Sequence, residues 1–161
     1  NAFRETTAEA AEALGLREGP VHAELRFNDT GVWVVEIAAR SIGGLCSRVL
    51  RFGAGISLEE LILRHAFGQD IGPTQRAGEA VGVMLLPVPK KGVLRSVWGV
   101  DVAKKVPGIQ DVVLTIPLGQ EVEPLPEGSR YLGFIFARAE RPEQVEGSLR
   151  EAYRRLAVMI E

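Results

Sequence analysis

Hydrophobic and polar residues alternate most regularly in the segment 21–27. One side of this segment is apolar and the other is polar, which is the two-residue period of a strand with one buried face. The next four residues, Asn-Asp-Thr-Gly at 28–31, have the composition of a turn, and residues 32–37 are rich in β-branched and aromatic side chains. The pattern therefore predicts a β-hairpin, with Trp33 on the face opposite to Glu36 and in the core.

Helical patterns come before and after this hairpin. Residues 2–14 favour a helix, and residues 45–52 are expected to be helical as well. Ser57 and Glu60 form a capping box, which predicts a helix that begins after Ser57 and ends at Gly68.

Short apolar segments dominate the second half of the chain. We expect strands at 81–88 and 93–98 that pair with each other, a short helix at 101–105, and further strands at 112–116 and 131–137. A last helix begins at Pro142, and its apolar positions keep helical spacing as far as Ile160. This order of elements predicts an α+β protein.

Composition and charge narrow the class of protein. At 161 residues the chain has the length of one domain, but the polar segment 69–78 is expected to link two regions, 1–68 and 79–161. A net charge of −2 gives no reason to expect nucleic acid or a membrane surface as a partner, and the apolar runs are too short to span a bilayer. Residues 1–15 lack the pattern of a signal peptide, and we expect a cytoplasmic protein.

Two glutamates of the predicted hairpin are the first candidates for chemistry. With a three-residue loop at 29–31, the expected pairs are Asn28 with Val32, Arg26 with Val34, and Glu24 with Glu36. Two like charges with Cβ atoms about 5 Å apart destabilise a sheet unless a further group neutralises them. Mg²⁺ or Mn²⁺ suits carboxylate oxygens and completes its shell with water and phosphates. The residues alone leave open the alternative that Arg26 or Arg40 neutralises the pair without a metal.

An arginine and two glycines extend this candidate site. Arg40 follows Glu36 by four residues, just past the expected end of the strand, where its guanidinium can bind phosphate or carboxylate oxygens. Gly43 and Gly44 lead toward the helix expected at 45–52, so free backbone N–H groups there could hold an anion. The simpler alternative for the glycines is an ordinary turn. Together the residues indicate a site for a phosphate and a metal.

This stretch resembles the metal-binding end of ATP-grasp ligases, in particular the L-amino-acid ligase and biotin-carboxylase-like branch. The resemblance rests on His-Ala-Glu-Leu at 22–25 and on Glu-Ile-Ala-Ala-Arg-Ser-Ile-Gly-Gly at 36–44. The second half is similar to the C-terminal lobe of such ligases, at 83–87, 91–94, 125–128 and 131–135 and in the final helix.

The resemblance implies a fold and a set of roles. Residues 1–68 would be the C-terminal part of an ATP-grasp fold, an antiparallel hairpin sheet with helices, and 79–161 a small mixed-sheet lobe with a final helix. Glu24 and Glu36 would bind the Mg²⁺ (or Mn²⁺) that bridges the phosphates of ATP. Gly43 and Gly44 would lie in the ATP site, and Arg40 would stabilise an acyl phosphate. Many family members carry Asn two residues after the second acid, where this sequence has Ala38.

The activity implied by the resemblance is the ADP-forming ligation of a small carboxylate to an amine. The family's N-terminal α/β domain, nucleotide-contacting lysines and glycine-rich lid have no counterpart in these residues. The implied partner is therefore the missing N-terminal part of the same protein, and the piece alone is expected to be inactive. Two alternatives stay open: a biotin-carboxylase-type ligase, and a non-catalytic binding or oligomerisation domain. The sequence also leaves a homodimer open.

Overall fold

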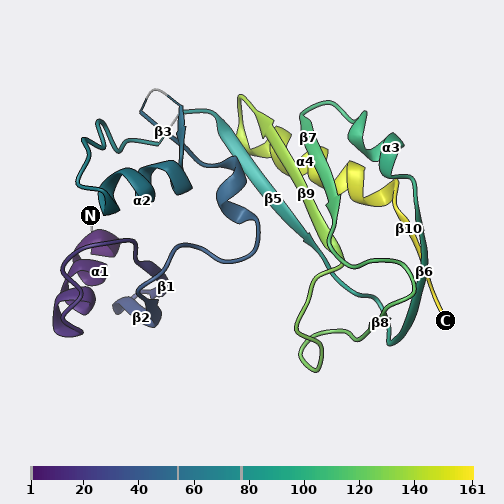
Figure 1. Ribbon diagram of the computed structural model, residues 1–161, viewed down its shortest axis with the longest axis horizontal. Helices are drawn as coiled ribbons and strands as arrows, with labels where there is room; N and C mark the ends of the chain where they lie inside the picture. The colour runs from purple at the N-terminus through teal and green to yellow at the C-terminus, as the bar shows by residue number, and fades with distance from the viewer. Residues whose placement is uncertain (1, 54, 77) are drawn as a thin grey trace. The chain divides into compact units, whose positions relative to one another are not determined.

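The chain forms two units, Asn1–Ala77 and Gly78–Glu161. The structure is a computed structural model that describes residues 2–53, 55–76 and 78–161, and its elements are labelled in Figure 1. The α+β class expected from the sequence is confirmed.

In its described residues the first unit contains two α-helices, a β-hairpin and a second, very short strand pair. Its elements are α1 (Ala2–Ala13), β1 (His22–Asn28), β2 (Gly31–Ala38), the 3₁₀-helix η1 (Cys46–Val49), β3 (Arg51–Phe52), β4 (Ile56–Ser57) and α2 (Leu58–Ala66). The segment expected to be helical at 45–52 is thus a four-residue 3₁₀-helix followed by a strand, because Arg51 and Phe52 pair with Ser57 and Ile56.

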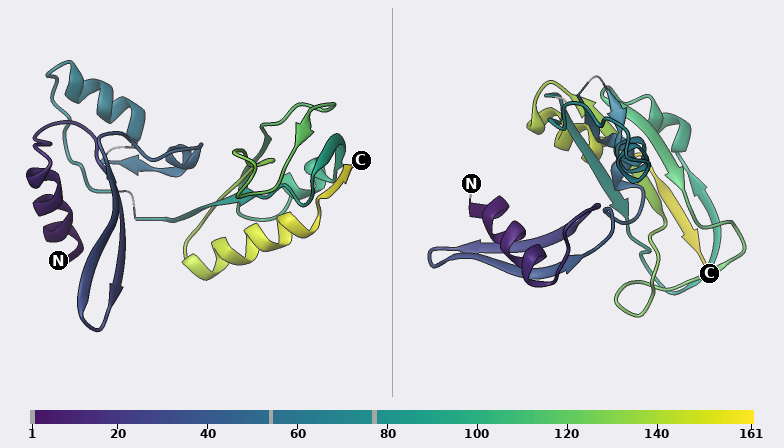
Figure 2. Two further views of the ribbon diagram at one scale, coloured as in Figure 1. Left: turned by 90° about the horizontal axis from the view of Figure 1, so that it is seen from below. Right: turned by 60° about the vertical axis from the view of Figure 1, so that its left-hand side comes forward.

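Helix α1 lies along the hairpin of β1 and β2, as both views of Figure 2 show. The rings of Phe3 and Phe27 meet edge to face, with centroids 5.9 Å apart. Helix α2 begins as the capping box predicted, because the Ser57 hydroxyl accepts a hydrogen bond of 3.1 Å from the backbone N–H of Glu60. Among the residues that the structure describes in this unit, no apolar side chain is buried.

The second unit contains two three-stranded antiparallel sheets and two helices. Its elements are β5 (Ala80–Leu86), β6 (Gly92–Trp98), α3 (Val100–Lys104), β7 (Ile109–Leu114), β8 (Glu121–Val122), β9 (Gly133–Ala139), α4 (Pro142–Arg154) and β10 (Ala157–Ile160). The strand orders are β5-β9-β7 and β10-β6-β8.

Two expectations for this unit were wrong. Strands β5 and β6, predicted to pair with each other, lie in different sheets, and β5 pairs with β9 instead. The last helix ends at Arg154, and the apolar residues after it form strand β10, which pairs with β6. Short apolar segments carry no information about which strand they pair with, and four residues are too few to separate strand from helix by period.

The hydrophobic core lies in this second unit. Helix α4 covers one face of the β5-β9-β7 sheet (Figure 1), and Val145 and Leu149 on the helix face Gly82 on β5. The largest fully buried side chains are Leu86, Leu94, Leu132 and Ile135. Among the helices of the described residues, none combines the length and the hydropathy needed to cross a bilayer.

Candidate metal and phosphate site

Glu24 and Glu36 lie directly opposite each other in the hairpin, as the sequence predicted. Residues opposite each other in an antiparallel pair share one face of the sheet, so both carboxylates point to the same side. Their side chains are 56% and 50% exposed, so each is accessible to a ligand from solvent.

The predicted loop was wrong, although the glutamate pairing was right. Near the turn Asn28 pairs with Gly31 and Arg26 with Trp33, which is one residue out of step with the prediction. The register then shifts between Glu24 and Leu25, so one extra residue of β2 forms a bulge. The shift at the turn and the shift at the bulge cancel, and this returns Glu24 to the partner that the sequence indicated.

The two-residue turn places Trp33 on the acidic face, and the bulge returns Glu36 to the same face. Arg26 lies two residues after Glu24 in β1, so the two side chains share a face. Trp33 pairs with Arg26, so the indole lies on the side of the carboxylates and not on the face opposite to Glu36. Its side chain is 57% exposed, not in the core, and its Nε1–H donates to Oδ1 of Asn28 at 3.3 Å. The prediction missed this placement because it assumed a loop of three residues, whereas Asn28 pairs with Gly31.

Arg40 lies at the open end of the hairpin and contacts Glu36. Its Nη2 is 3.1 Å from Oε1 of Glu36, and its Nη1 donates to the backbone carbonyl of Ser41, also at 3.1 Å. The guanidinium is about half exposed, so it can still reach a further anion. The arginine that the sequence offered as an alternative to a metal thus neutralises one of the two carboxylates.

The two glycines differ in how far the structure supports an anion site. A Cβ on Gly43 would lie 3.9 Å from Nη1 of Arg40, so this residue is beside the guanidinium. Gly44 has a φ of 62°, which is the left-handed conformation of a turn. The helix expected to follow is only the 3₁₀-helix Cys46–Val49, so it supplies no long array of free N–H groups.

The carboxylates of Glu24 and Glu36 could supply part of the ligands of a divalent cation. Nε2 of His22 lies 3.5 Å from Oε1 of Glu24 on the same face, and Ala38 opposite His22 adds no ligand. Within the described residues no group of three or more His, Cys, Asp or Glu is arranged to hold a metal ion. Two carboxylates suit Mg²⁺ when water and phosphate oxygens complete the shell.

Two family models match the chain, one in each unit. Residues 1–49 match the ATP-grasp domain, and residues 84–161 match the L-amino acid ligase C-terminal domain 2.

Solved structures with the same fold are ligases and synthetases. The L-amino acid ligase from Bacillus licheniformis superposes with a TM-score of 0.80 and 26% identity, over 99% of this chain and 40% of that chain. Phosphoribosylglycinamide synthetase from Anaerococcus prevotii has a TM-score of 0.72 and 16% identity, over 95% of this chain and 40% of that one. N5-carboxyaminoimidazole ribonucleotide synthetase from Thermotoga maritima has a TM-score of 0.71 and 20% identity, over 99% and 42%. The last two show a shared fold only.

One curated protein is also similar in sequence. It is "Uncharacterized protein y4rH" of Sinorhizobium fredii (strain NBRC 101917 / NGR234), 25% identical over 127 residues, which are 79% of this chain and 27% of that protein. The chain therefore spans between about a quarter and two fifths of the length of these relatives.

The fold and the matches indicate one class of protein: residues 1–49 match the ATP-grasp domain, and the fold of the chain is similar to that of part of an L-amino acid ligase. The second unit is similar to the second C-terminal domain of L-amino acid ligases, which its residues 84–161 match. The resemblance drawn from residues 22–44 and from the second half is confirmed.

Proposed function

We propose that the chain is the C-terminal part of an ATP-dependent, ADP-forming ligase of the L-amino acid ligase type, which joins a carboxylate to an amine. The observation that carries this proposal is the pairing of Glu24 with Glu36 beside the Arg40 guanidinium. The matches to an ATP-grasp domain and to L-amino acid ligase support it.

In this proposal each residue has a physical task. Glu24 and Glu36 would hold Mg²⁺ or Mn²⁺, which would neutralise charge on the phosphates of ATP. Arg40 binds the anionic oxygens of the acyl phosphate and is itself oriented by Glu36 and the Ser41 carbonyl. Gly43 leaves open the space beside that guanidinium.

The substrate carboxylate would take the terminal phosphoryl group of ATP, which leaves ADP and an acyl phosphate, and the amine would then displace phosphate and form the amide. The carboxylate pair and Arg40 lie on an exposed face, and the chain covers 40% of the length of the L-amino acid ligase that it resembles. We therefore propose that the catalytically competent protein includes the nucleotide-binding portion found in its longer relatives, and that residues 1–161 alone do not form ADP.

Substitutions in the longer enzyme that carries this sequence test the proposal. We expect Glu36→Gln and Arg40→Ala each to lower amino-acid-dependent ADP release at least about 100-fold, the size of effect seen when a charge-stabilising group is removed from an active site. Asp29→Asn, which removes a carboxylate from the turn of the same hairpin, serves as the matched control and should keep the wild-type rate.

A metal titration separates the two roles. Raising Mg²⁺ should partly restore Glu24→Gln, because a weakened metal site is refilled by mass action, but should not restore Arg40→Ala. Wild-type rates in Glu36→Gln and Arg40→Ala would contradict the site assignment, and ADP release by isolated 1–161 would contradict the need for a further portion.

A further inference from the structure

Strand β10 forms one free edge of the β10-β6-β8 sheet. It pairs with β6 on one side, and in the described part of the chain no backbone hydrogen bond links residues 157–160 to a strand on the other side. An unpaired edge presents a row of N–H and C=O groups that another strand can bind.

The two edges of this sheet differ in how they are protected. Strand β8 at the opposite edge has only two residues, and Glu121 and the Lys91–Glu123 ion pair place charges there. Charges on a short edge strand oppose further pairing. Strand β10 has four apolar residues and no charge within it.

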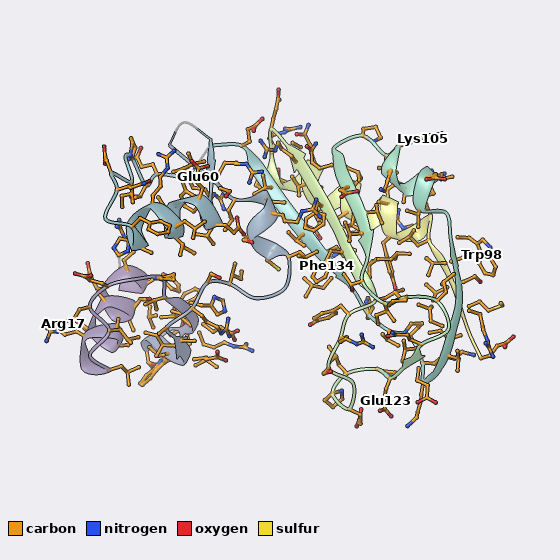
Figure 3. The ribbon with its side chains drawn as sticks, in the orientation of Figure 1. Arg17, Glu60, Trp98, Lys105, Glu123 and Phe134 are labelled. Atoms are coloured by element: carbon orange, nitrogen blue, oxygen red, sulfur yellow. The ribbon has the colours of Figure 1, made fainter. Side chains whose placement is uncertain are left out.

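The outward face of β10 and β6 carries exposed apolar side chains. Trp98 pairs with Ala157, and Ser96 pairs with Met159, so these four share one face. Trp98 is 55% exposed and Met159 is 39% exposed, and Figure 3 shows Trp98 projecting away from the sheet. The alternating residues Val97 and Val158 pack against the core on the other face.

The ends of β10 carry opposite charges. Arg155 precedes the strand and Glu161 follows it, and both side chains are more than half exposed although each has an internal ion pair, with Glu151 and with Arg95. In an antiparallel pair of two identical strands, the start of one lies beside the end of the other. The charge pattern of β10 is therefore complementary to itself.

The alternation of faces restricts how two copies can pair. Outward residues must lie opposite outward residues. The two-fold axis between the strands must therefore lie at the level of a residue that pairs with its own copy. An axis at Val158 places Ala157 opposite Met159 of the other copy and Arg155 near Glu161 of the other copy. Ala157 is small, so Trp98 can extend across it toward that methionine, and sulfur–aromatic contacts are favourable.

We propose that this chain forms a two-fold symmetric homodimer through β10, joining the two β10-β6-β8 sheets into one six-stranded antiparallel sheet. The same patch of each copy contacts its counterpart, as a two-fold interface requires. Because the strand is short, the buried area lies at the low end of specific interfaces, and we expect a dissociation constant of about 10–100 μM. The proposal is independent of the ligase function.

Sedimentation of chain 1–161 between micromolar and several hundred micromolar concentrations tests the dimer. We expect Met159→Lys to weaken dimerisation at least about tenfold, because it places two like charges at the centre of the interface. Leu118→Lys, which charges an exposed leucine of the same unit outside the patch, should leave the dissociation constant unchanged. A chain that is monomeric throughout this range, or a dimer that Met159→Lys does not weaken, would overturn the proposal.

Cysteine cross-linking tests the register. In a Cys46→Ser background, chains with Ala157→Cys mixed with chains with Met159→Cys should form a disulfide-linked dimer, since these positions lie opposite each other. Either variant alone should cross-link much more slowly. In such a sample the two cysteines of a dimer are offset from each other by two residues along the paired strands. Equal rates in the mixed and single samples would contradict this pairing.

Discussion

At the scale of single residues, the candidate site depends on charges that are close together and exposed. Glu24 faces Glu36, and Glu36 binds Arg40 at 3.1 Å. Pairs of exposed charges contribute only about 0–1 kcal/mol to stability. The Glu36–Arg40 ion pair is therefore expected to add little to folding stability.

A different acid of the first unit contributes to stability in a pH-dependent way. The hydroxyl of Ser47, which is buried, donates a hydrogen bond to Oε1 of Glu59 and so links η1 to α2. This bond, more than the bond from its own backbone N–H, lowers the pKa of Glu59 below its ordinary value of 4.5. A carboxylate whose pKa is lowered by folding stabilises the folded state above pH 4.5, and that contribution is lost as the pH falls through the lowered pKa.

We expect Ser47→Ala to lower the free energy of unfolding of the first unit by about 1 kcal/mol at pH 7, since Glu59 remains in contact with solvent. The difference from wild type should shrink as the pH falls below the ordinary value of 4.5. Urea denaturation followed by NMR signals of α2 measures both, with Ser129→Ala in an exposed loop as the control. A difference that stays constant from pH 7 to pH 3 would show that the hydroxyl acts without the carboxylate.

At the scale of elements, α4 packs so closely against β5 that Gly82 on the strand has no room for a side chain, whereas Gly147 on the helix does. A Cβ at Gly82 would lie 2.6 Å from Cγ1 of Val145 and 3.0 Å from Cδ1 of Leu149, so the helix would have to move away from the strand. Gly147 is on the exposed side of the same helix, where an added Cβ meets nothing within 4 Å. The two positions test the same glycine-to-alanine change in opposite surroundings.

Gly82→Ala is therefore expected to destabilise the second unit by about 1–3 kcal/mol through overpacking. Gly147→Ala is expected to stabilise it by about 0.5–1 kcal/mol, because alanine has the higher helix propensity. Thermal and urea unfolding of the two variants beside wild type gives both values. Equal effects of the same sign would mean that the α4–β5 contact does not determine the outcome.

At the scale of the whole molecule, burial is divided unequally between the two units. Every buried apolar side chain in the described residues lies between Leu86 and Ile160, and Ser47 is the single buried residue that they include in the first unit. In the first unit Phe27, Trp33 and Phe67 are all exposed. Since apolar burial is the main stabilising contribution to folding, the units should differ in stability.

We expect amides of β1, β2 and α2 to exchange with solvent faster than those of β5, β9 and α4, by several orders of magnitude. The reason is that local opening of the first unit exposes little additional apolar surface. Hydrogen exchange of chain 1–161 measured by NMR tests this, with each unit serving as the internal comparison. Similar protection in both units would contradict the expected difference.

Local sequence patterns were sufficient for elements whose signal lies within a few residues. Ser57 begins α2 because its hydroxyl caps the helix, and Pro142 begins α4 because its ring is compatible with the first helical turn. The hairpin was found from alternation, and Glu24 was correctly placed opposite Glu36. The candidate site is local in the same sense, since its acids and its arginine lie within residues 24–40.

Only the tertiary structure decided the pairing of distant segments and the position of the bulge. The sequence by itself determined the α+β class and the hairpin, because caps and alternating faces involve neighbouring residues, whereas the facing of Glu24 and Glu36 depends on a turn and a bulge that the pattern did not locate. It did not determine that β5 pairs with β9, that β10 is a strand or that Trp33 lies on the acidic face. These features depend on contacts between segments far apart along the chain, or on the pairing of single residues in the hairpin. The hydrophobic pattern of an apolar segment does not specify which strand it pairs with.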